Sequence, residues 1–195
     1  TFGKGVDQFA YGITPYALER GEGAYLWDVD GNRYLDTMMS LGAVLLGYCN
    51  PIVDKAIQQQ LKNGISFSLA HRLEVEVGEM LCERIPCADM VRLGKNGNDV
   101  TSAAIRLSRY VTGNNHVLFC GYHGWQDWYI SKTSMNGGIP NEVGNYSHRF
   151  PYNDLDALEG LVQELEGKTA CIIMEPTSRI HPKEGYLQGV RDLAD

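Results

Sequence analysis

The sequence predicts an α/β fold with a mostly parallel sheet, and three observations in its second half support this prediction. Short apolar runs typical of buried strands occupy residues 90–93, 117–120 and 170–174. Between them lie stretches in which apolar residues recur every three or four positions, as in amphipathic helices. Each connection is also long enough for a right-handed crossover, which parallel strands require. We see no internal repeat and no low-complexity linker.

The first part of the chain predicts a hairpin preceded by irregular structure. Residues 1–23 are rich in glycine and show no regular pattern. Two short alternating runs in residues 24–36 flank Asp30-Gly31, a pair favoured where a tight turn needs a positive φ. Residues 37–51 are apolar but interrupted by glycines, so we expect a buried loop or a turn beside a ligand.

Two helices should follow the hairpin. Asn50 can cap free N–H groups, and Pro51 fits the first turn of a helix that Gly64 would end. A second helix is expected over residues 73–84, because its apolar residues fall on one face and Pro86 stops it.

The predicted strands of the second half alternate with two further helices. A helix over residues 99–111 should end at Gly113, and another should begin at Asp154. Residues 121–151 between them are expected to be one long loop. The predicted buried stripe of the first helix consists of Val100, Ala104, Leu107 and Val111.

Composition excludes several classes of function. The 195 residues carry a net charge of −7 and no basic run, which argues against binding to nucleic acid or to an anionic membrane. No apolar stretch approaches the roughly 20 residues needed to span a bilayer. The five cysteines are scattered, with no spacing typical of a metal site, and are best interpreted as reduced thiols of a cytosolic protein.

The carboxyl ends of the predicted strands carry the polar residues. In open α/β sheets ligands bind beyond these ends, so residues 94–99, 121–128 and 175–179 should converge. The backbone N–H groups of Gly97 and Asn98 would lie at a helix N-terminus, where a phosphate is favoured. Simple capping by Asn98 or Asp99 would also explain these residues.

Two other groups could contribute to the same site. Tyr122 and His123 follow a strand and lie between Gly121 and Gly124, which would let a planar ring approach and stack. They could equally cover the edge of the core. Glu175 ends an apolar strand and could orient a ligand, or it could form an ion pair with a distant arginine.

Taken together, these blocks resemble the N-terminal part of the class III aminotransferases, within the pyridoxal-phosphate enzymes of fold type I. The glutamate-1-semialdehyde aminomutase-like subgroup is the most similar. The ordered blocks that carry the resemblance are GEGAYLWDVDGNRYLD, GYCNPIVDKAI, HRLEVEVGEML, VRLGKNGNDVTSAAIRLSRYVTG, CGYHGWQDWYI, YNDLDALEGL and ACIIMEP. The resemblance implies an N-terminal segment over residues 1–65 and an incomplete large cofactor-binding domain over residues 66–195.

The resemblance also implies a cofactor, pyridoxal 5′-phosphate, and roles for particular residues. Asn96, Gly97 and Asn98 occupy the place of the family's phosphate-binding turn, with amides in place of hydroxyl side chains. Tyr122 would stack on the pyridine ring with His123 beside it. Glu175 would lie close to the cofactor.

No catalytic residue is expected within residues 1–195. In the family, the lysine that forms the Schiff base and the aspartate that pairs with the pyridine nitrogen follow the matched region. The predicted function is therefore transfer of an amino group from a small-molecule donor to a ketone or aldehyde, with this chain an N-terminal fragment. The alternative is an inactive truncated homologue that acts as a binding or scaffold piece. The family also implies a cytoplasmic homodimer, with residues 121–151 as a candidate contact.

Overall fold

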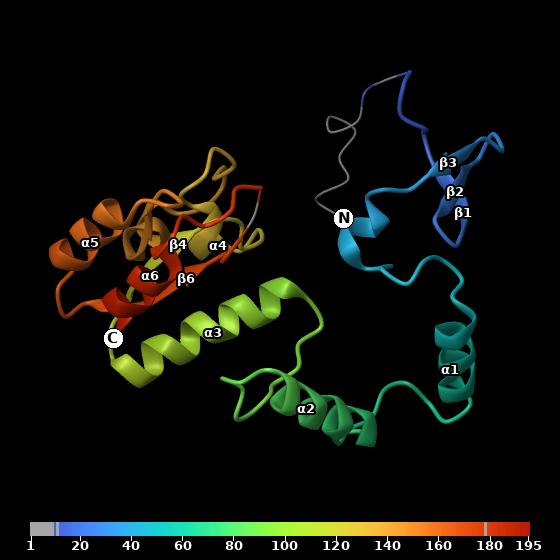
Figure 1. The fold of residues 1–195 in the computed structure, drawn as a ribbon, viewed down its shortest axis with the longest axis horizontal. Coiled ribbons are helices and arrows are strands. Elements are labelled where there is room, and N and C mark those ends of the chain that lie inside the picture. The colour runs from blue at the N-terminus through green and yellow to red at the C-terminus, as the bar shows by residue number, and fades with distance from the viewer. Residues whose placement is uncertain (1–9, 11, 178) are drawn as a thin grey trace. The chain divides into compact units, whose positions relative to one another are not determined.

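The computed structural model describes residue 10, residues 12–177 and residues 179–195 (Figure 1). The chain forms two compact units, Thr1–Val75 and Glu76–Asp195. The domain boundary predicted between residues 65 and 66 stays a prediction. Most of the segment before residue 12, which was expected to be irregular, lies outside the described residues.

Unit 1 contains a small antiparallel sheet in the order β1-β2-β3. Its strands are β1 (Leu18–Glu22), β2 (Tyr25–Asp28) and β3 (Arg33–Leu35). The predicted hairpin is confirmed as β2 and β3, and Gly31 in its turn has a φ of 84°. The expectation of irregular structure up to residue 23 was wrong for β1, which has no apolar alternation and is held by backbone pairing with β2.

A buried carboxylate organises the hairpin turn. Asp28 is 3% exposed and accepts hydrogen bonds from the backbone N–H groups of Asp30 (3.0 Å) and Asn32 (2.8 Å). Its second oxygen accepts from the Asn32 side chain (3.0 Å) and from the Tyr34 hydroxyl (2.8 Å). The side-chain hydrogen bond from Asn32 is the main cause that lowers the pKa of Asp28. The turn is thus fixed by a charged network.

The rest of unit 1 is helical but leaves its apolar residues exposed. Residues 37–51, which include the 3₁₀ helix η2 (Met39–Gly42), were expected to form a buried loop or a turn beside a ligand, but Leu41 is 79% and Leu46 72% exposed. Burial was therefore wrong, because no described layer of unit 1 packs over these side chains, and a turn beside a ligand stays a prediction. The next helix, α1 (Pro51–Leu61), is confirmed with its cap: Asn50 Oδ1 accepts from the N–H groups of Ile52 and Val53.

Helix α2 (Arg72–Arg84) follows and is also confirmed, beginning one residue before its expected start. Among the described residues, no helix is both long enough and apolar enough to cross a membrane.

Unit 2 is built on a parallel sheet in the order β5-β4-β6. Its strands are β4 (His116–Cys120), β5 (Ser147–Arg149) and β6 (Thr169–Met174). The predicted strands at 117–120 and 170–174 and their parallel pairing are confirmed. The strand expected over residues 90–93 was wrong, because this stretch finds no partner in the described sheet.

Residues 121–151 are not the single loop that was expected. They contain α4 (Asp127–Ile130), the 3₁₀ helix η3 (Asn141–Tyr146) and β5. Strand β5 has only three residues and no apolar alternation, so nothing local indicated it. It forms because its backbone pairs with β4, with Ser147 opposite Val117.

Helices cover both faces of this sheet. Leu118 and Cys120 of β4 belong to a buried cluster with side chains from α5 (Leu155–Glu164) and α6 (Tyr186–Ala194). Phe119 points to the opposite face, because side chains alternate along a strand, and its ring contacts Trp128 and Tyr129 of α4. Helix α5 begins as predicted, with Asp154 accepting from the N–H of Ala157 at 2.9 Å.

Helix α3 (Gly97–Thr112) packs on β6 and ends at Gly113, which has a φ of 71°. Its predicted buried stripe was wrong. Ile105 is the buried residue of the helix, whereas Leu107 is 63% and Val111 73% exposed. At about 100° per residue, Leu107 lies on the opposite side of the helix from Ile105. The sequence showed an apolar face but not which partner would cover it.

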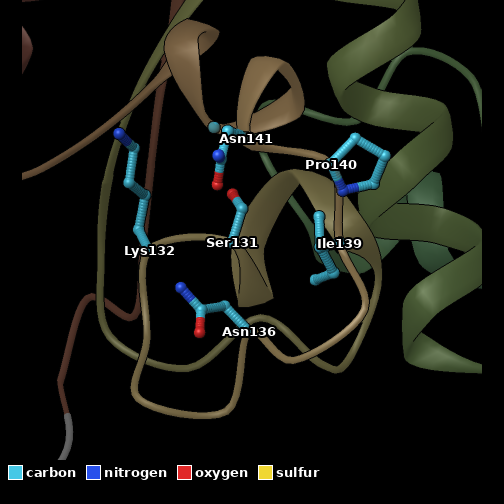
Figure 2. Close-up of a pocket in the computed structure, with 7 residues that line it drawn as sticks. Ser131, Lys132, Asn136, Ile139, Pro140 and Asn141 are labelled. Carbon is cyan, nitrogen blue, oxygen red and sulfur yellow. The ribbon is translucent and has the colours of Figure 1, made fainter.

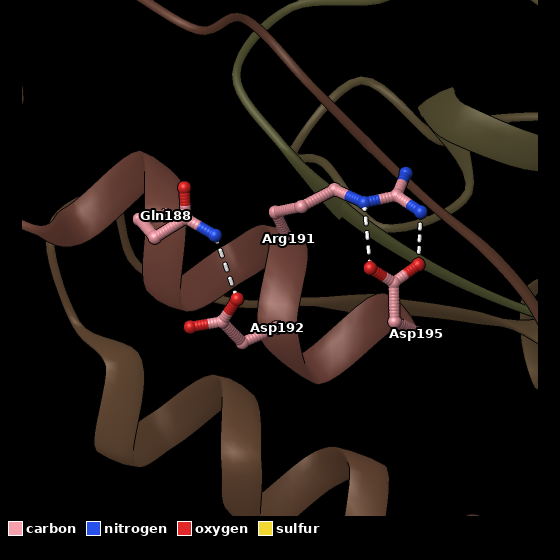
Figure 3. Close-up of polar contacts among 4 residues, drawn as sticks. All are labelled: Gln188, Arg191, Asp192 and Asp195. Carbon is pink, nitrogen blue, oxygen red and sulfur yellow. Dashed lines mark hydrogen bonds and ion pairs between the residues drawn. The ribbon is translucent and has the colours of Figure 1, made fainter.

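Helix α6 shows the amphipathic division that the core requires. Tyr186 and Val190 face the buried cluster. The outer face carries polar pairs one turn apart: Gln188 donates to Asp192 Oδ1 at 2.7 Å, and Arg191 donates to both carboxylate oxygens of Asp195 (Figure 3). Such exposed pairs contribute little stability each, so α6 is held mainly by its apolar face.

Candidate functional site

The head of α3 presents unpaired backbone donors. Asn96 occupies the N-cap position, and the N–H groups of Gly97 and Asn98 have no hydrogen-bond partner among the described residues. The Asp99 carboxylate accepts from the backbone N–H of Asn96 at 3.0 Å, so it is folded back onto the cap. Because α3 has 16 residues, these two donors carry the positive end of a substantial helix dipole.

The loop after β4 runs close to the end of β6. Gly121 has a φ of 91°, and a Cβ there would come within 2.7 Å of Glu175 Oε2. The same carboxylate oxygen accepts from the backbone N–H of Tyr122 at 3.2 Å, and the N–H of Glu175 donates to Cys120 O at 3.2 Å. Glycine is therefore required at 121, and Glu175 holds the backbone on which Tyr122 lies.

The Tyr122 ring is available to a ligand. Its side chain is 66% exposed, and its ring stands edge-on to Tyr129 with the centroids 5.8 Å apart. The ring is thus braced from within unit 2, while its exposure leaves a large part of the aromatic surface open to a ligand.

The helix head and the loop meet at Gly124. Its φ is 105°, and a Cβ at this position would overlap Asn98 Oδ1. The Thr101 hydroxyl, one turn into α3, lies 3.5 Å from the carbonyl oxygen of His123. The predicted convergence of the three segments is therefore observed, although no strand precedes the first of them: Asn98 lies against the Gly121–Gly124 loop, and that loop lies against Glu175.

His123 faces the interior of unit 2. It is 8% exposed, and its Nε2 lies 2.9 Å from Cys120 O, which requires Nε2 to be the protonated donor. Burial is the main cause that lowers the pKa of His123, so the ring is neutral near pH 7. Its contacts with Phe119 and Trp128 give it a packing role beneath the loop. A direct role at the cofactor stays a prediction.

Gln126 is a residue of this region that the sequence did not single out. Its Nε2 donates to Thr101 Oγ1 at 2.8 Å and to His123 O at 2.6 Å. A glutamine between a tryptophan and an aspartate carries no recognisable signal, because only the fold brings α3 beside it.

A separate hollow of about 180 Å³ opens in the segment between α4 and η3 (Figure 2). It is lined by Ser131, Lys132, Asn136, Ile139, Pro140, Asn141 and Gly144. None of the six residues expected to contact a cofactor lines it. The hollow is thus distinct from the convergence of strand ends.

Comparison with known proteins identifies the family. The sequence profile of the class-III aminotransferases matches residues 8–195. The chain belongs to this family. The resemblance seen in the ordered sequence blocks is thereby confirmed, and so is its restriction to the N-terminal part of the relatives.

Two curated relatives are about equally similar to this chain in sequence but have different activities. Glutamate-1-semialdehyde 2,1-aminomutase 2 of Exiguobacterium sp. is 36% identical over 199 residues, covering 94% of this chain and 46% of the relative. The 3-aminobutyryl-CoA aminotransferase of Cloacimonas acidaminovorans is 37% identical over 194 residues, with 96% and 46% covered. The chain thus spans about half of the length of the curated relatives it matches.

A solved structure confirms the fold. The omega-transaminase from Sphaerobacter thermophilus superposes with a TM-score of 0.87 at 25% sequence identity, covering 98% of this chain and 48% of that one. The α/β fold with a parallel sheet and crossover helices, predicted as a fragment of fold type I, is thereby confirmed.

The residues of the site fit a phosphorylated planar ligand. Two N–H groups at the head of α3 have no partner in the described part of the chain and can receive a phosphate, and the acidic side chain of that turn is occupied by Asn96. Tyr122, whose ring is exposed, lies two residues before Gly124 in the sequence, and Gly124 lies against Asn98 of the same helix head. The side-chain amides of Asn96 and Asn98 carry N–H donors that could add to these contacts.

Proposed function

We propose that the protein containing residues 1–195 is a pyridoxal-phosphate-dependent aminotransferase or aminomutase that transfers an amino group to a ketone or aldehyde. One observation carries this proposal: the unpaired N–H groups of Gly97 and Asn98 lie beside the loop that presents Tyr122. Membership of the class-III family supports it.

Each residue of the site would have a defined task. The Gly97 and Asn98 amides, with the Asn96 side chain, would hold the phosphate. Tyr122 would cover one face of the pyridine ring, while Glu175 would keep the Tyr122 backbone in place through its hydrogen bond. When bound, pyridoxal phosphate supplies an electron sink for the carbon that carries the amino group.

Gly124 offers a direct test in the full-length protein. Gly124→Ala places a Cβ on Asn98 Oδ1 and strains a φ of 105°, so we expect the affinity for pyridoxal phosphate to fall at least about tenfold. The matched control is Gly137→Ala, where a Cβ meets nothing within 4 Å and φ is not positive. Equilibrium titration followed by the cofactor's visible absorption measures both.

Two results would contradict the proposal. The wild-type protein would bind no pyridoxal phosphate, or Gly124→Ala and Gly137→Ala would bind it equally well. Whether residues 1–195 alone are inactive, as the truncated alternative holds, stays a prediction. Assaying them beside the full-length protein decides it.

The two relatives pose the remaining choice between transfer among molecules and transfer within one. The need for a second substrate separates them. An aminotransferase gives product only when a carbonyl acceptor is added. An aminomutase yields product without needing an added carbonyl acceptor.

The proposal extends to assembly and location. We propose a homodimer in which residues 121–151 contribute to the contact, acting in the cytoplasm on small-molecule donors and acceptors. The mildly acidic charge of −7 and the free cysteines of the described residues support this setting. Analytical ultracentrifugation of the full-length protein tests the dimer.

A further inference from the structure

The Gln126 side chain joins the two halves of the site. Its Nε2 donates both to Thr101 Oγ1 on α3, at 2.8 Å, and to the carbonyl oxygen of His123 in the Tyr122 loop, at 2.6 Å. We propose that Gln126 is a positioning residue that sets the spacing between the phosphate-binding helix head and the Tyr122 ring. This inference rests on the proposed function.

Thr101 extends the connection to the helix head itself. Its hydroxyl accepts from Gln126 and has its own proton left to donate. The two carbonyl oxygens within reach are those of Asn98, at 3.3 Å, and His123, at 3.5 Å. The hydrogen bonds therefore run from the loop through Gln126 and Thr101 to the first turn of α3. Linked bonds of this kind restrict movement more than separate ones do.

The other end of the Gln126 amide is packed against the same place. Gln126 Oε1 is buried without a hydrogen-bond partner among the described residues. It would lie 2.5 Å from a Cβ on Gly124, at the point where that Cβ would also overlap Asn98. A larger or differently shaped side chain at 126 would push the loop away from the helix head. Both polar atoms of the Gln126 amide therefore lie where they affect the spacing between the helix head and the Tyr122 loop.

This spacing matters only for a ligand that occupies both halves at once. A rigid ligand with a ring and a phosphate gains the full benefit of both contacts when their separation matches its own. A ligand that has only the ring, or only the phosphate, is indifferent to the separation. The loss of Gln126 should therefore be selective for the joined ligand.

The test uses Gln126→Met in the full-length protein freed of its cofactor. Methionine keeps the approximate length but donates no hydrogen bond. Calorimetric titration with pyridoxamine 5′-phosphate, pyridoxamine and inorganic phosphate compares ligands that do not react with lysine. We expect the affinity for pyridoxamine 5′-phosphate to fall about tenfold, which corresponds to the net contribution of one or two hydrogen bonds. The affinities for pyridoxamine and for inorganic phosphate should change less than about twofold.

Gln188→Met is the matched control. Gln188 is an exposed residue of α6 and donates to Asp192 Oδ1 on the same helix, so it is not part of the Gln126–Thr101 bridge (Figure 3). It should leave all three affinities unchanged. Thr101→Val removes the acceptor from the other side of the bridge and should show the same selective loss. The double variant should lose little more than either single variant, because both act on one connection.

The outcomes separate this inference from the proposed function. If wild type binds pyridoxamine 5′-phosphate tightly but Gln126→Met and Thr101→Val bind it equally well, the inference is wrong and the function stands. An equal loss for all three ligands would show a merely structural role and also overturn it. If the wild type binds none of the ligands, the proposed function fails, and the inference fails with it.

Discussion

Each of the two units of this chain is stabilised internally by a different kind of interaction. In unit 2 the side chains of Val117, Leu118 and Phe119 on the central strand are fully buried. In unit 1, by contrast, the single buried residue among those that the structure describes is Asp28, which is 3% exposed. Unit 2 therefore has an apolar core of its own, whereas unit 1 is organised by a polar network around a turn.

This difference indicates how each unit depends on its surroundings. A three-stranded sheet organised around one buried carboxylate buries too little apolar area to be stable by itself. Unit 1 also leaves apolar side chains such as Leu45 (77% exposed) uncovered. Exposed apolar residues gathered in this way usually mark a contact surface. Unit 2, whose sheet is covered by helices on both faces, depends less on contacts outside itself for its stability.

The largest effect should come from the core of unit 2. Leu158 on α5 is fully buried in the apolar cluster, so Leu158→Ala should reduce the free energy of unfolding by about 2–5 kcal/mol. Urea denaturation measures it, followed by the fluorescence of Trp128 in a background that lacks the other two tryptophans. The control is Leu187→Ala on α6, where the side chain is 43% exposed and the loss should be clearly smaller. Equal losses would remove the distinction between the core and the surface of this unit.

The core of unit 2 was also the part that sequence could predict. β4, β6 and the Asp154-capped helix α5 have strong local signals, because their apolar patterns coincide with the faces that become buried. β1 and β5 have none, since backbone pairing with a neighbouring strand creates them. The face of α3 that is buried was likewise decided by its contact with β6.

The same limit holds at the site. Glycines and aromatic residues at strand ends indicated where ligand-binding residues gather, and the structure brings Asn98, Gly124 and Glu175 to one region. Gln126 could not be predicted, because its significance lies in a contact with Thr101, which is 25 residues away in sequence. Sequence patterns reported the elements and their ends, while side-chain bridges between elements required the fold.

The second effect in size concerns the polar network of unit 1. Asp28→Ala leaves the N–H groups of Asp30 and Asn32 and the hydroxyl of Tyr34 without their acceptor. The hairpin should loosen, and fluorescence of Trp27 on β2 should report unfolding at lower urea concentration. Asp30→Ala, at an exposed position of the same turn, is the control and should change little. An unchanged midpoint in Asp28→Ala would mean that unit 1 does not depend on this carboxylate.

Acid should weaken the two units in different pH windows, with a smaller effect. In unit 2, burial is the main cause that lowers the pKa of His123. Burial is also the main cause that lowers the pKa of His148, and electrostatic repulsion from His116 is the second cause. The unfolded chain then binds more protons than the folded one, so the stability contributed by these neutral histidines is complete above about pH 6.5. It is lost as the pH falls through the lowered pKa values.

Unit 1 should resist acid further. The hydrogen bond from Asn32 lowers the pKa of Asp28, and that from the Tyr48 hydroxyl lowers the pKa of Asp36. Their contribution is complete above about pH 4 and is lost only as the pH falls below it. In variants that retain either Trp27 or Trp128, the Trp128 signal should therefore weaken first on acidification from pH 7 to pH 5. The reverse order would show that the histidines do not govern unit 2.

The smallest effect should come from the apolar surface of unit 1, measured on residues 1–195 alone. Leu46 is 72% exposed, so Leu46→Ser removes little buried area and should change the free energy of unfolding by less than about 0.5 kcal/mol. The same substitution in the full-length protein should reduce stability more, because the contact surface that unit 1 lacks is then supplied by the rest of the protein or by a second copy.

Urea denaturation of both forms, repeated at two protein concentrations, separates these sources. A dependence on concentration identifies the second copy, since the stability of an associating protein rises with its concentration. A loss of several kcal/mol in residues 1–195 alone would instead show that unit 1 covers this leucine itself, and the contrast between the two units would not hold.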